Sequence, residues 1–279
     1  MGDTALVLGG GGLTGIGWEI GVLHGLARAG VDLTTAGLVV GTSAGSVVGA
    51  QLTSGLLTPE ELYERQLVPP DGETAAHMGA MIMARFAWGV VRSRDAKSYG
   101  MRMGRMALAA RTPREAERRA VIAQRLVSHE WPARRLVVTA VDAVTGEFRA
   151  FGAGDGVPLV DAVSASCAVP GVWPPVTIGG RRWIDGGVRS AANADLASGY
   201  ARVVVLAPVT VGGGPVPAAR AQAARLAAEG SRVVLITPDR AARDAFGRNV
   251  LDPERRAPAA RAGLAQAAAH AEDVARVWS

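Results

Sequence analysis

The stretch LVLGGGGLTGIGWEIGVLHGL, from Leu6 to Leu26, joins a short apolar run to a run of glycines and then to a segment with apolar residues at helical spacing. The apolar run is typical of a strand that is buried on both faces. The segment over 16–29 predicts a helix that ends at Gly30. Strand, glycine loop and helix in this order form the repeating unit of an α/β fold.

Apolar, β-branched runs of the same kind recur along the chain, with helical segments between them. Because each run is nearly all apolar rather than alternating, we expect one mostly parallel sheet that helices cover on both sides. The runs are ALVLG from Ala5, GLVVG from Gly37, RLVVTAV from Arg135, ARVVVLAP from Ala201 and SRVVLITP from Ser231. One intervening helix is expected to have Thr112 as its N-cap, Pro113 in its first turn and Glu115 closing a capping box.

Residues 70–111 interrupt this alternation and are rich in methionine. Methionine side chains are flexible and suit irregular apolar surfaces. The segment is therefore interpreted either as a helical lid or cap, or as two ordinary packed helices. A C-terminal helical segment is expected over 252–279, and without a repeat or a clear linker the sequence predicts a single domain over 1–279.

The composition narrows the classes of protein that fit. The chain has 279 residues, of which 49% are hydrophobic, enough for a sizeable core. Its formal net charge of +5 comes almost entirely from arginine, since Lys97 is the only lysine. Codon bias in a GC-rich genome and a basic surface for anionic partners are both explanations of this excess. No cluster of aromatic and basic residues indicates nucleic-acid binding, and the single Cys167 excludes an intramolecular disulfide and a cysteine-based metal site.

The N-terminal sequence MGDTALVLGGGG has no basic segment before an apolar stretch, so it lacks the pattern of a secretory signal. No uninterrupted apolar run reaches the roughly 18 residues of a membrane span. We therefore expect a cytoplasmic protein and leave open a peripheral contact with an anionic membrane surface.

A second glycine-rich stretch, VVGTSAGSVVGA over 39–50, places Ser43 between Gly41 and Gly45. The pattern G-x-S-x-G is the signature of a serine nucleophile on a sharp strand-to-helix turn, although an ordinary glycine-rich loop has the same letters. Since neighbouring parallel strands end at the same edge of a sheet, Ser43 and the glycines at 10–12 are expected to lie together.

Three interpretations of the first glycine loop are open. Its G-x-G-x-x-G spacing fits a dinucleotide site, but such a site needs an acidic residue at the end of the second strand. Thr42 and Ser43 stand there instead, and Asp32 precedes that strand. Consecutive glycine amides also form an oxyanion hole, which stabilises the negative oxygen of a tetrahedral acyl-transfer intermediate. A tight turn without a ligand is the third interpretation.

A serine hydroxyl needs a base before it acts as a nucleophile. The histidines are poorly placed for that role, since none lies on a loop after a late strand. They are His24, His77, His129 and His270. Asp185 is a better candidate, because it follows the apolar run Trp183-Ile184 and precedes Gly186 and Gly187, which let substrate approach closely.

A carboxylate with an ordinary pKa of about 3.9 is a weak base at neutral pH, so Asp185 needs apolar surroundings that raise this value. Four bulky apolar residues nearby in the sequence are candidates for that surrounding. They are Trp173, Pro174, Pro175 and Trp183.

Three motifs occur in order along the chain: G-G-G-G-x-x-G, then G-T-S-A-G, then D-G-G. Together they resemble the patatin-like phospholipases. The segments EIGVLHGL, LVVTAVDAVTGEFRAFG and SASCAVPGVWPPV extend this resemblance, which covers residues 4–200 approximately. It implies a three-layer α/β/α sandwich with a mostly parallel central sheet.

The resemblance also implies a function and its residues. It implies hydrolysis of fatty-acyl esters of phospholipids, lysophospholipids or related lipids without a metal or cofactor. Ser43 is the implied nucleophile and Asp185 the implied base. The implied oxyanion-hole amides are those of Gly10, Gly11 and Gly12. The implied turn-shaping glycines are Gly15, Gly41, Gly45, Gly186 and Gly187.

One position departs from the family pattern. The family's glycine loop usually has Arg or Lys where this chain has Thr14. This departure keeps open a non-catalytic module that binds lipid or a partner protein. Two further alternatives stay open: a dinucleotide-binding protein, and an enzyme that transfers the acyl group to an acceptor other than water.

Overall fold

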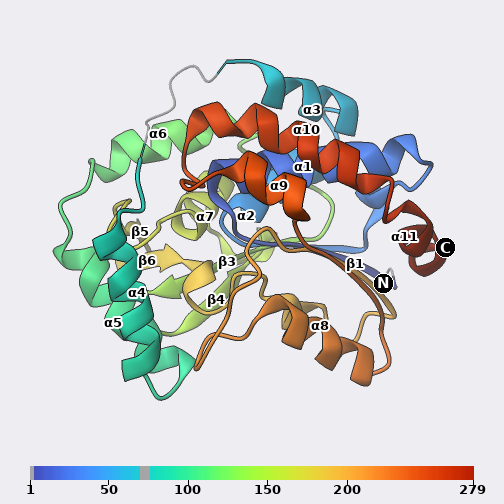
Figure 1. Cartoon of the computed structure of the whole chain (residues 1–279). Helices are drawn as coiled ribbons and strands as arrows, with labels where there is room; N and C mark the ends of the chain where they lie inside the picture. Colours follow the sequence, from blue (N-terminus) through green and yellow to red (C-terminus); the bar gives the residue numbers. More distant parts are fainter. Residues whose placement is uncertain (1–2, 70–75) are drawn as a thin grey trace.

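The structure is a computed structural model, and it describes residues 3–69 and 76–279. Within these residues it contains one eight-stranded sheet between two layers of helices (Figure 1), which is the α/β/α sandwich that the sequence predicts. The strand order is β5-β6-β3-β2-β1-β7-β8, and β4 pairs with β3. The strands are β1 (Thr4–Leu8), β2 (Leu38–Gly41), β3 (Leu136–Asp142), β4 (Phe148–Phe151), β5 (Val176–Ile178), β6 (Arg181–Asp185), β7 (Arg202–Leu206) and β8 (Arg232–Ile236).

The five strands expected from apolar runs form the parallel part of the sheet, β3-β2-β1-β7-β8. The strands β4, β5 and β6 pair antiparallel at the other end. In the parallel part, Leu8 at the end of β1 lies opposite Gly41 at the end of β2. This register brings the loops that follow β1 and β2 to the same edge of the sheet.

Helices cover both faces of the sheet. On one face α1 (Gly12–Arg28) packs closely against α10 (Arg256–Ala267), and α2 (Ala44–Ser54) and α7 (Leu159–Ser166) lie beside them (Figure 1). The opposite face carries α8 (Ala219–Ala228). Glycine permits the close contact of α1 with α10, because a Cβ on Gly21 would stand 2.1 Å from the carbonyl oxygen of Ala260. The remaining helices are α3 (Pro59–Leu67), α4 (Ala80–Arg92), α5 (Ala96–Ala109), α6 (Glu115–Arg125), α9 (Arg240–Phe246) and α11 (Ala271–Trp278).

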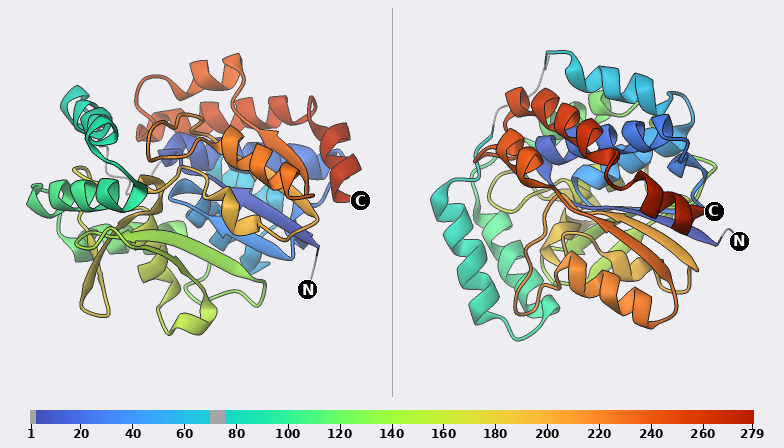
Figure 2. Two further views of the ribbon diagram at one scale, coloured as in Figure 1. Left: turned by 90° about the horizontal axis from the view of Figure 1, so that it is seen from below. Right: turned by 45° about the vertical axis from the view of Figure 1, so that its right-hand side comes forward.

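The methionine-rich segment forms the helix pair α4 and α5. The two views of Figure 2 show this pair together, at the side of the molecule away from both chain termini. Tyr99 and Met103 of α5 are buried, and Phe86 and Val90 of α4 pack against them. Residues 70–75 of the segment lie outside the described residues. Its role as a cap and the single-domain organisation stay predictions.

The expected start of α6 was wrong. The helix begins at Glu115 rather than after Thr112, and its N-cap is Arg114, whose amide donates to the carboxylate of Glu117 at 3.3 Å. The carboxylate of Glu115 instead accepts a hydrogen bond from the backbone amide of Thr177 at 2.6 Å. Glu115 therefore makes a tertiary contact with β5 instead of the capping box with Thr112 that the sequence predicts. The C-terminal part of the chain contains the helices α10 and α11.

Candidate active site

Ser43 lies on a sharp turn between β2 and α2, with φ 52° and ψ −114°. A positive φ at a non-glycine residue costs roughly 1–3 kcal/mol and persists only where surrounding contacts hold it. Here the amide of Ser43 donates to Ser166 Oγ at 2.9 Å, and the Ser43 carbonyl accepts from Ser46 Oγ at 2.6 Å. A nucleophile elbow has this kind of strained strand-to-helix geometry.

The serine turn and the glycine loop are joined through their backbones. The amide of Thr42 donates to the Leu8 carbonyl at 3.0 Å, and the amide of Gly45 donates to the Gly9 carbonyl at 2.9 Å. A Cβ at Gly45 would stand 2.0 Å from the Leu8 carbonyl oxygen, so no other residue fits there. A Cβ at Gly41 would stand 2.6 Å from Ser46 Cα. Gly45 therefore lets the two loops touch, and Gly41 lets the serine turn fold back tightly on the strand.

Asp185 ends β6, which pairs with β3. Its carboxylate accepts a hydrogen bond from the Gly187 amide at 2.7 Å. Burial of this carboxyl raises its pKa to about 7, although the nearby Ser43 hydroxyl and the Gly187 amide act to lower it. The loop after Asp185 packs closely on β3 because residue 186 is glycine, since a Cβ there would stand 2.2 Å from Thr139 Oγ1. The structure thus brings together the serine and the aspartate that separate motifs predict.

The glycine loop offers two of the three expected amides. The Gly10 amide donates to the Ala191 carbonyl at 2.7 Å and is therefore occupied. Within residues 3–69 and 76–279, no backbone carbonyl accepts a hydrogen bond from the amides of Gly11 and Gly12. Gly12 has φ +63°, a conformation that glycine adopts readily, and a Cβ there would stand 2.5 Å from the Val250 carbonyl. Gly11 and Gly12 are the amides that remain for a ligand.

Thr14 stabilises the glycine loop. Its side chain is buried, and its hydroxyl donates to the Gly11 carbonyl at 3.2 Å. At the next residue, a Cβ added to Gly15 would stand 3.3 Å from Ala44 Cβ and 3.4 Å from Pro208 Cβ, so the space there is tight. Glu19 is also fully buried, and burial raises the pKa of its carboxyl well above the ordinary value, which favours the neutral form. The position where the family usually has a cation therefore holds a neutral hydrogen-bond donor.

A polar residue that no motif marks links the serine turn to the aspartate loop. Asn193 is fully buried, and its Nδ2 donates to Thr42 Oγ1 at 3.1 Å and to the Gly186 carbonyl at 3.2 Å. The Thr139 hydroxyl donates to the same Thr42 oxygen at 2.9 Å. Asn193 has φ 50°, a left-handed conformation that asparagine tolerates better than most residues. Its role was missed because it arises only from tertiary contacts.

The Ser43–Asp185 pair lies at a cavity of about 650 Å³. Most of its wall is apolar, and none of the histidines is among its lining residues. The glycines at 10–12 line it together with Trp173. Apolar side chains line it from three segments: Met78, Met83, Phe86, Ala87, Val90 and Val91 from residues 78–91, Val209, Val211 and Val216 before α8, and Val250 and Leu251 before α10. A long apolar chain fits such a wall, with its polar end at the serine.

Two arginines of α6 also line this cavity, Arg118 and Arg125. Arg118 is buried, and its guanidinium lies 3.7 Å above the centre of the Trp173 ring.

In the part of the chain that the structure describes, no group of three or more His, Cys, Asp or Glu side chains could hold a metal ion.

Comparison with known families identifies the class of protein. The sequence profile of the family described as patatin-like phospholipase matches residues 6–198. The chain therefore belongs to the patatin-like phospholipase family. Membership supports a lipid acyl hydrolase activity in general terms.

Two solved structures are similar to the chain in outline. VipD from Legionella pneumophila has 13% sequence identity and a TM-score of 0.47, and the match covers 98% of this chain and 66% of VipD. The type III effector protein ExoU has 14% identity and a TM-score of 0.42, with 99% of this chain and 53% of ExoU covered. The chain thus spans between half and two thirds of these proteins. No significant match was found among curated proteins.

The network around Asn193 leads to a prediction about stability. We expect Asn193→Gly to destabilise the protein by about 1–3 kcal/mol, because buried partners lose their hydrogen bonds. Asn193→Ala should cost about 1–2 kcal/mol more, because alanine disfavours the left-handed conformation that glycine accepts. Urea unfolding of the two variants and the wild type measures both effects. Equal stability of Asn193→Ala and the wild type would contradict the assignment.

Proposed function

We propose that the protein hydrolyses fatty-acyl esters of phospholipids, lysophospholipids or related lipids, with Ser43 as the nucleophile and Asp185 as the base. The observation that carries the proposal is that the Ser43 hydroxyl acts on the buried Asp185 carboxyl, whose pKa is about 7, and that both residues line one apolar cavity. No metal or cofactor takes part in the proposed reaction.

The first half of the reaction forms an acyl-enzyme. Asp185 takes the hydroxyl proton as Ser43 Oγ attacks the carbonyl carbon of the ester. The negative oxygen of the tetrahedral intermediate accepts hydrogen bonds from the Gly11 and Gly12 amides, and the N-terminus of α2 adds positive potential. The bond to the alcohol then breaks, and Asp185 returns the proton to the departing alkoxide.

The second half releases the fatty acid. Asp185 takes a proton from a water molecule as the water oxygen attacks the acyl carbon. The intermediate collapses, the bond to Ser43 Oγ breaks, and Asp185 returns the proton to Ser43. An alcohol in place of the water would give acyl transfer, which differs from hydrolysis only in its product.

The apolar wall supports the choice of substrate class. Side chains of α4 line the same cavity as Ser43, so we propose that α4 and α5 form a cap over the acyl chain. Met78, Met83 and Phe86 supply flexible or planar apolar surface there. Each buried methylene of a chain contributes about 0.8 kcal/mol, so the length of the cavity selects acyl length.

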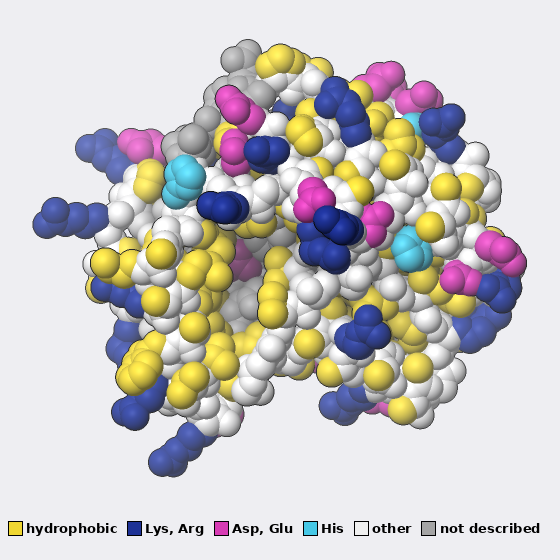
Figure 3. All heavy atoms as spheres, viewed as in Figure 1, with side chains coloured by type: hydrophobic (Ala, Val, Ile, Leu, Met, Phe, Trp, Pro, Cys, Tyr) yellow, Lys and Arg dark blue, Asp and Glu magenta, His cyan; other side chains and the backbone are white. Residues whose placement is uncertain are grey.

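We further propose that α4 contacts an anionic membrane surface. Met81, Met83, Trp88 and Val91 are exposed on this helix. Figure 3 shows hydrophobic side chains gathered over α4 and α5, with Lys and Arg side chains projecting around them, next to a hollow in the surface. Apolar residues bordered by cations are typical of interfacial helices. None of the helices in the described residues is both long and apolar enough to cross a membrane. A cytoplasmic location stays a prediction.

Replacement of the base tests the reaction directly. We expect Asp185→Asn to lower kcat/KM for a lipid ester by about 10²–10⁴-fold, because an amide cannot accept the Ser43 proton. The near-isosteric change should preserve the fold, which circular dichroism and thermal unfolding check. Asp244→Asn, on an exposed residue of α9, is the matched control and should keep wild-type activity. A folded and fully active Asp185→Asn would exclude Asp185 as the base of the reaction.

The raised pKa of Asp185 predicts a pH profile. Below a pKa of about 7 the carboxyl is protonated and cannot accept the serine proton, and above it the carboxylate is available. The rate constant kcat/KM should therefore rise with pH through about 7 and level off above it. Initial rates on a soluble ester between pH 5 and 9 measure this profile, and a rate that stays constant from pH 5 to 7 would contradict the role of Asp185.

The membrane contact predicts an effect of Trp88. Trp88→Ser removes an exposed apolar side chain from α4 and should weaken binding to phosphatidylglycerol vesicles by about tenfold or more, given the roughly 1.5–3 kcal/mol that a buried large side chain contributes. Leu56→Ser, an equally exposed position on the loop between α2 and α3, is the control and should bind as the wild type does. Vesicle co-sedimentation measures both variants. Equal losses in the two variants would exclude α4 as the contact.

A further inference from the structure

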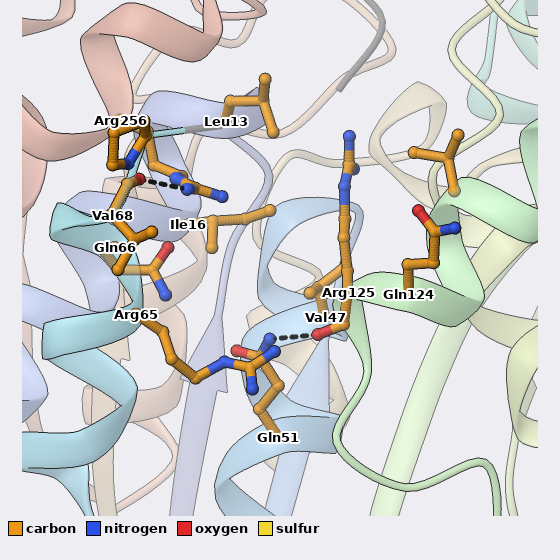
Figure 4. A pocket seen from close by; sticks show the side chains of 12 residues that line it. Leu13, Ile16, Val47, Gln51, Arg65, Gln66, Val68, Gln124, Arg125 and Arg256 are labelled. Carbon is orange, nitrogen blue, oxygen red and sulfur yellow. Dashed lines mark hydrogen bonds between the residues drawn. The ribbon is translucent and has the colours of Figure 1, made fainter. Parts of the chain in front are cut away.

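Two cavities lie beside α2, the helix that follows Ser43, and their walls differ in polarity. The smaller one, of about 260 Å³, is lined by amide and guanidinium side chains as well as by apolar residues (Figure 4). Its polar lining residues on α2, α3 and α6 include Gln51, Gln66, Gln124 and Arg65. Such a wall suits an acyl chain poorly, because methylenes would leave its amide groups without hydrogen-bond partners. The acyl chain of the proposed reaction therefore fits the larger cavity, of about 650 Å³, better.

Tyr99 is an exception in the apolar part of the larger cavity. Among the described residues that line the cavity from α4, α5 and the loop before α8, it is the one whose side chain carries a polar group. Its ring meets α4 at Gly89, where a Cβ would stand 2.9 Å from Tyr99 Cε2. The ring also belongs to the buried apolar cluster that contains Ile184 and Val188. Packing against both α4 and this cluster therefore fixes where the Tyr99 hydroxyl lies.

The hydroxyl of Tyr99 is free to bind a ligand. Tyr99 is only 3% exposed, and within residues 3–69 and 76–279 its hydroxyl forms no hydrogen bond. The hydroxyl oxygen is nevertheless not closed off from solvent, so it belongs to the small exposed part of the residue. Because Tyr99 lines the cavity, we infer that this exposed part faces into it. Burial raises the pKa of Tyr99 to about 12, so the hydroxyl is protonated at neutral pH and both donates and accepts hydrogen bonds.

An unsubstituted acyl chain would leave this hydroxyl without a partner. Methylenes neither donate nor accept hydrogen bonds, and a buried hydroxyl that loses its contact with water costs free energy. A hydroxyl group on the acyl chain would restore the hydrogen bond. A site with such a buried hydrogen-bonding group discriminates against a substrate that lacks the matching group.

Building on the proposed hydrolase function, we propose that Tyr99 determines substrate specificity through a hydrogen bond to a hydroxyl group on the acyl chain. The preferred substrates are then esters of hydroxylated fatty acids rather than of unsubstituted ones. Phe86 and Val90 of α4 line the same part of the cavity and supply apolar contacts to the methylenes of the chain. Tyr99 takes no part in the bond-breaking steps, which Ser43 and Asp185 carry out.

Binding without turnover tests this inference. In a Ser43→Ala background, lauric acid and monohydroxylated lauric acids that differ in the position of the hydroxyl group are titrated below their aggregation concentrations by isothermal titration calorimetry. The inference predicts that at least one hydroxylated acid binds about tenfold more tightly than lauric acid. Tyr99→Phe removes only the hydroxyl and should reduce this ratio to about one. Tyr63→Phe, the same change on α3 at a residue that does not line the cavity, is the matched control and should leave the ratio unchanged.

The same comparison in the active enzyme uses the methyl esters of these acids. The value of kcat/KM for the preferred hydroxylated ester should exceed that for methyl laurate by about tenfold. Tyr99→Phe should lower kcat/KM for the hydroxylated ester and raise it for methyl laurate, because the unpartnered hydroxyl is gone. A merely structural role of Tyr99 would instead lower both values together and leave their ratio unchanged.

Each outcome separates the inference from the hydrolase function. Equal binding of lauric acid and all of its hydroxylated forms, or a ratio that Tyr99→Phe leaves unchanged, would overturn the inference even where the wild type hydrolyses esters. A binding ratio that depends on Tyr99, in a wild type that hydrolyses no ester, would support the role of Tyr99 and reject the hydrolase. An effect of Tyr99→Phe that appears with monolaurin but with none of the free acids would place the hydroxyl beside the alcohol part of the substrate and overturn the inference.

Discussion

The register between β1 and β2 is the constraint on which the candidate site depends. Leu8 lies opposite Gly41, so the loop after each strand begins at the same edge of the sheet. Two backbone hydrogen bonds then join the loops, and Gly45 permits them because a Cβ would collide with the Leu8 carbonyl. A shift of this register would separate Ser43 from the glycine amides. The positive φ of Ser43 is held by the hydrogen bond from its amide to Ser166 Oγ and by the one its carbonyl accepts from Ser46 Oγ.

The antiparallel end of the sheet adds the second constraint. Asp185 reaches Ser43 because β6 pairs with β3, which itself pairs with β2, and Asn193 closes the remaining gap with hydrogen bonds to both loops. Burial then raises the pKa of the aspartate towards neutrality. The same burial that makes the fold stable thus gives the carboxylate the basicity that the proposed reaction needs.

The sequence predicts the parallel part of the fold well, because strands buried on both faces leave near-continuous apolar runs. It predicts β4 and β5 poorly, because these short strands lie at the border of the sheet and their residues are partly exposed. The start of α6 was misplaced because Glu115 binds Thr177 of β5 rather than its own helix. Local signals fail where a tertiary partner competes for the same side chain.

The same division holds at the site. Ser43 and Asp185 stand in short motifs, so their proximity could be expected, whereas Asn193 and Tyr99 reach the site only through packing. Gly10 illustrates the limit most clearly, since its motif position suggests a free amide and the fold pairs that amide with Ala191. Thr14 is the opposite case. It departs from the family pattern, and yet its hydroxyl stabilises the glycine loop through a hydrogen bond to the Gly11 carbonyl.

The central claim is that Ser43 is an activated nucleophile, and covalent labelling by a fluorophosphonate probe tests it most directly. The probe reports an activated serine without requiring the natural substrate. The account predicts rapid labelling of the wild type, loss of labelling in Ser43→Ala and in Asp185→Asn, and undiminished labelling in Ser198→Ala, which changes an exposed serine far along the chain. A well-folded wild type that is not labelled, or a Ser43→Ala variant that is labelled as the wild type is, would contradict it.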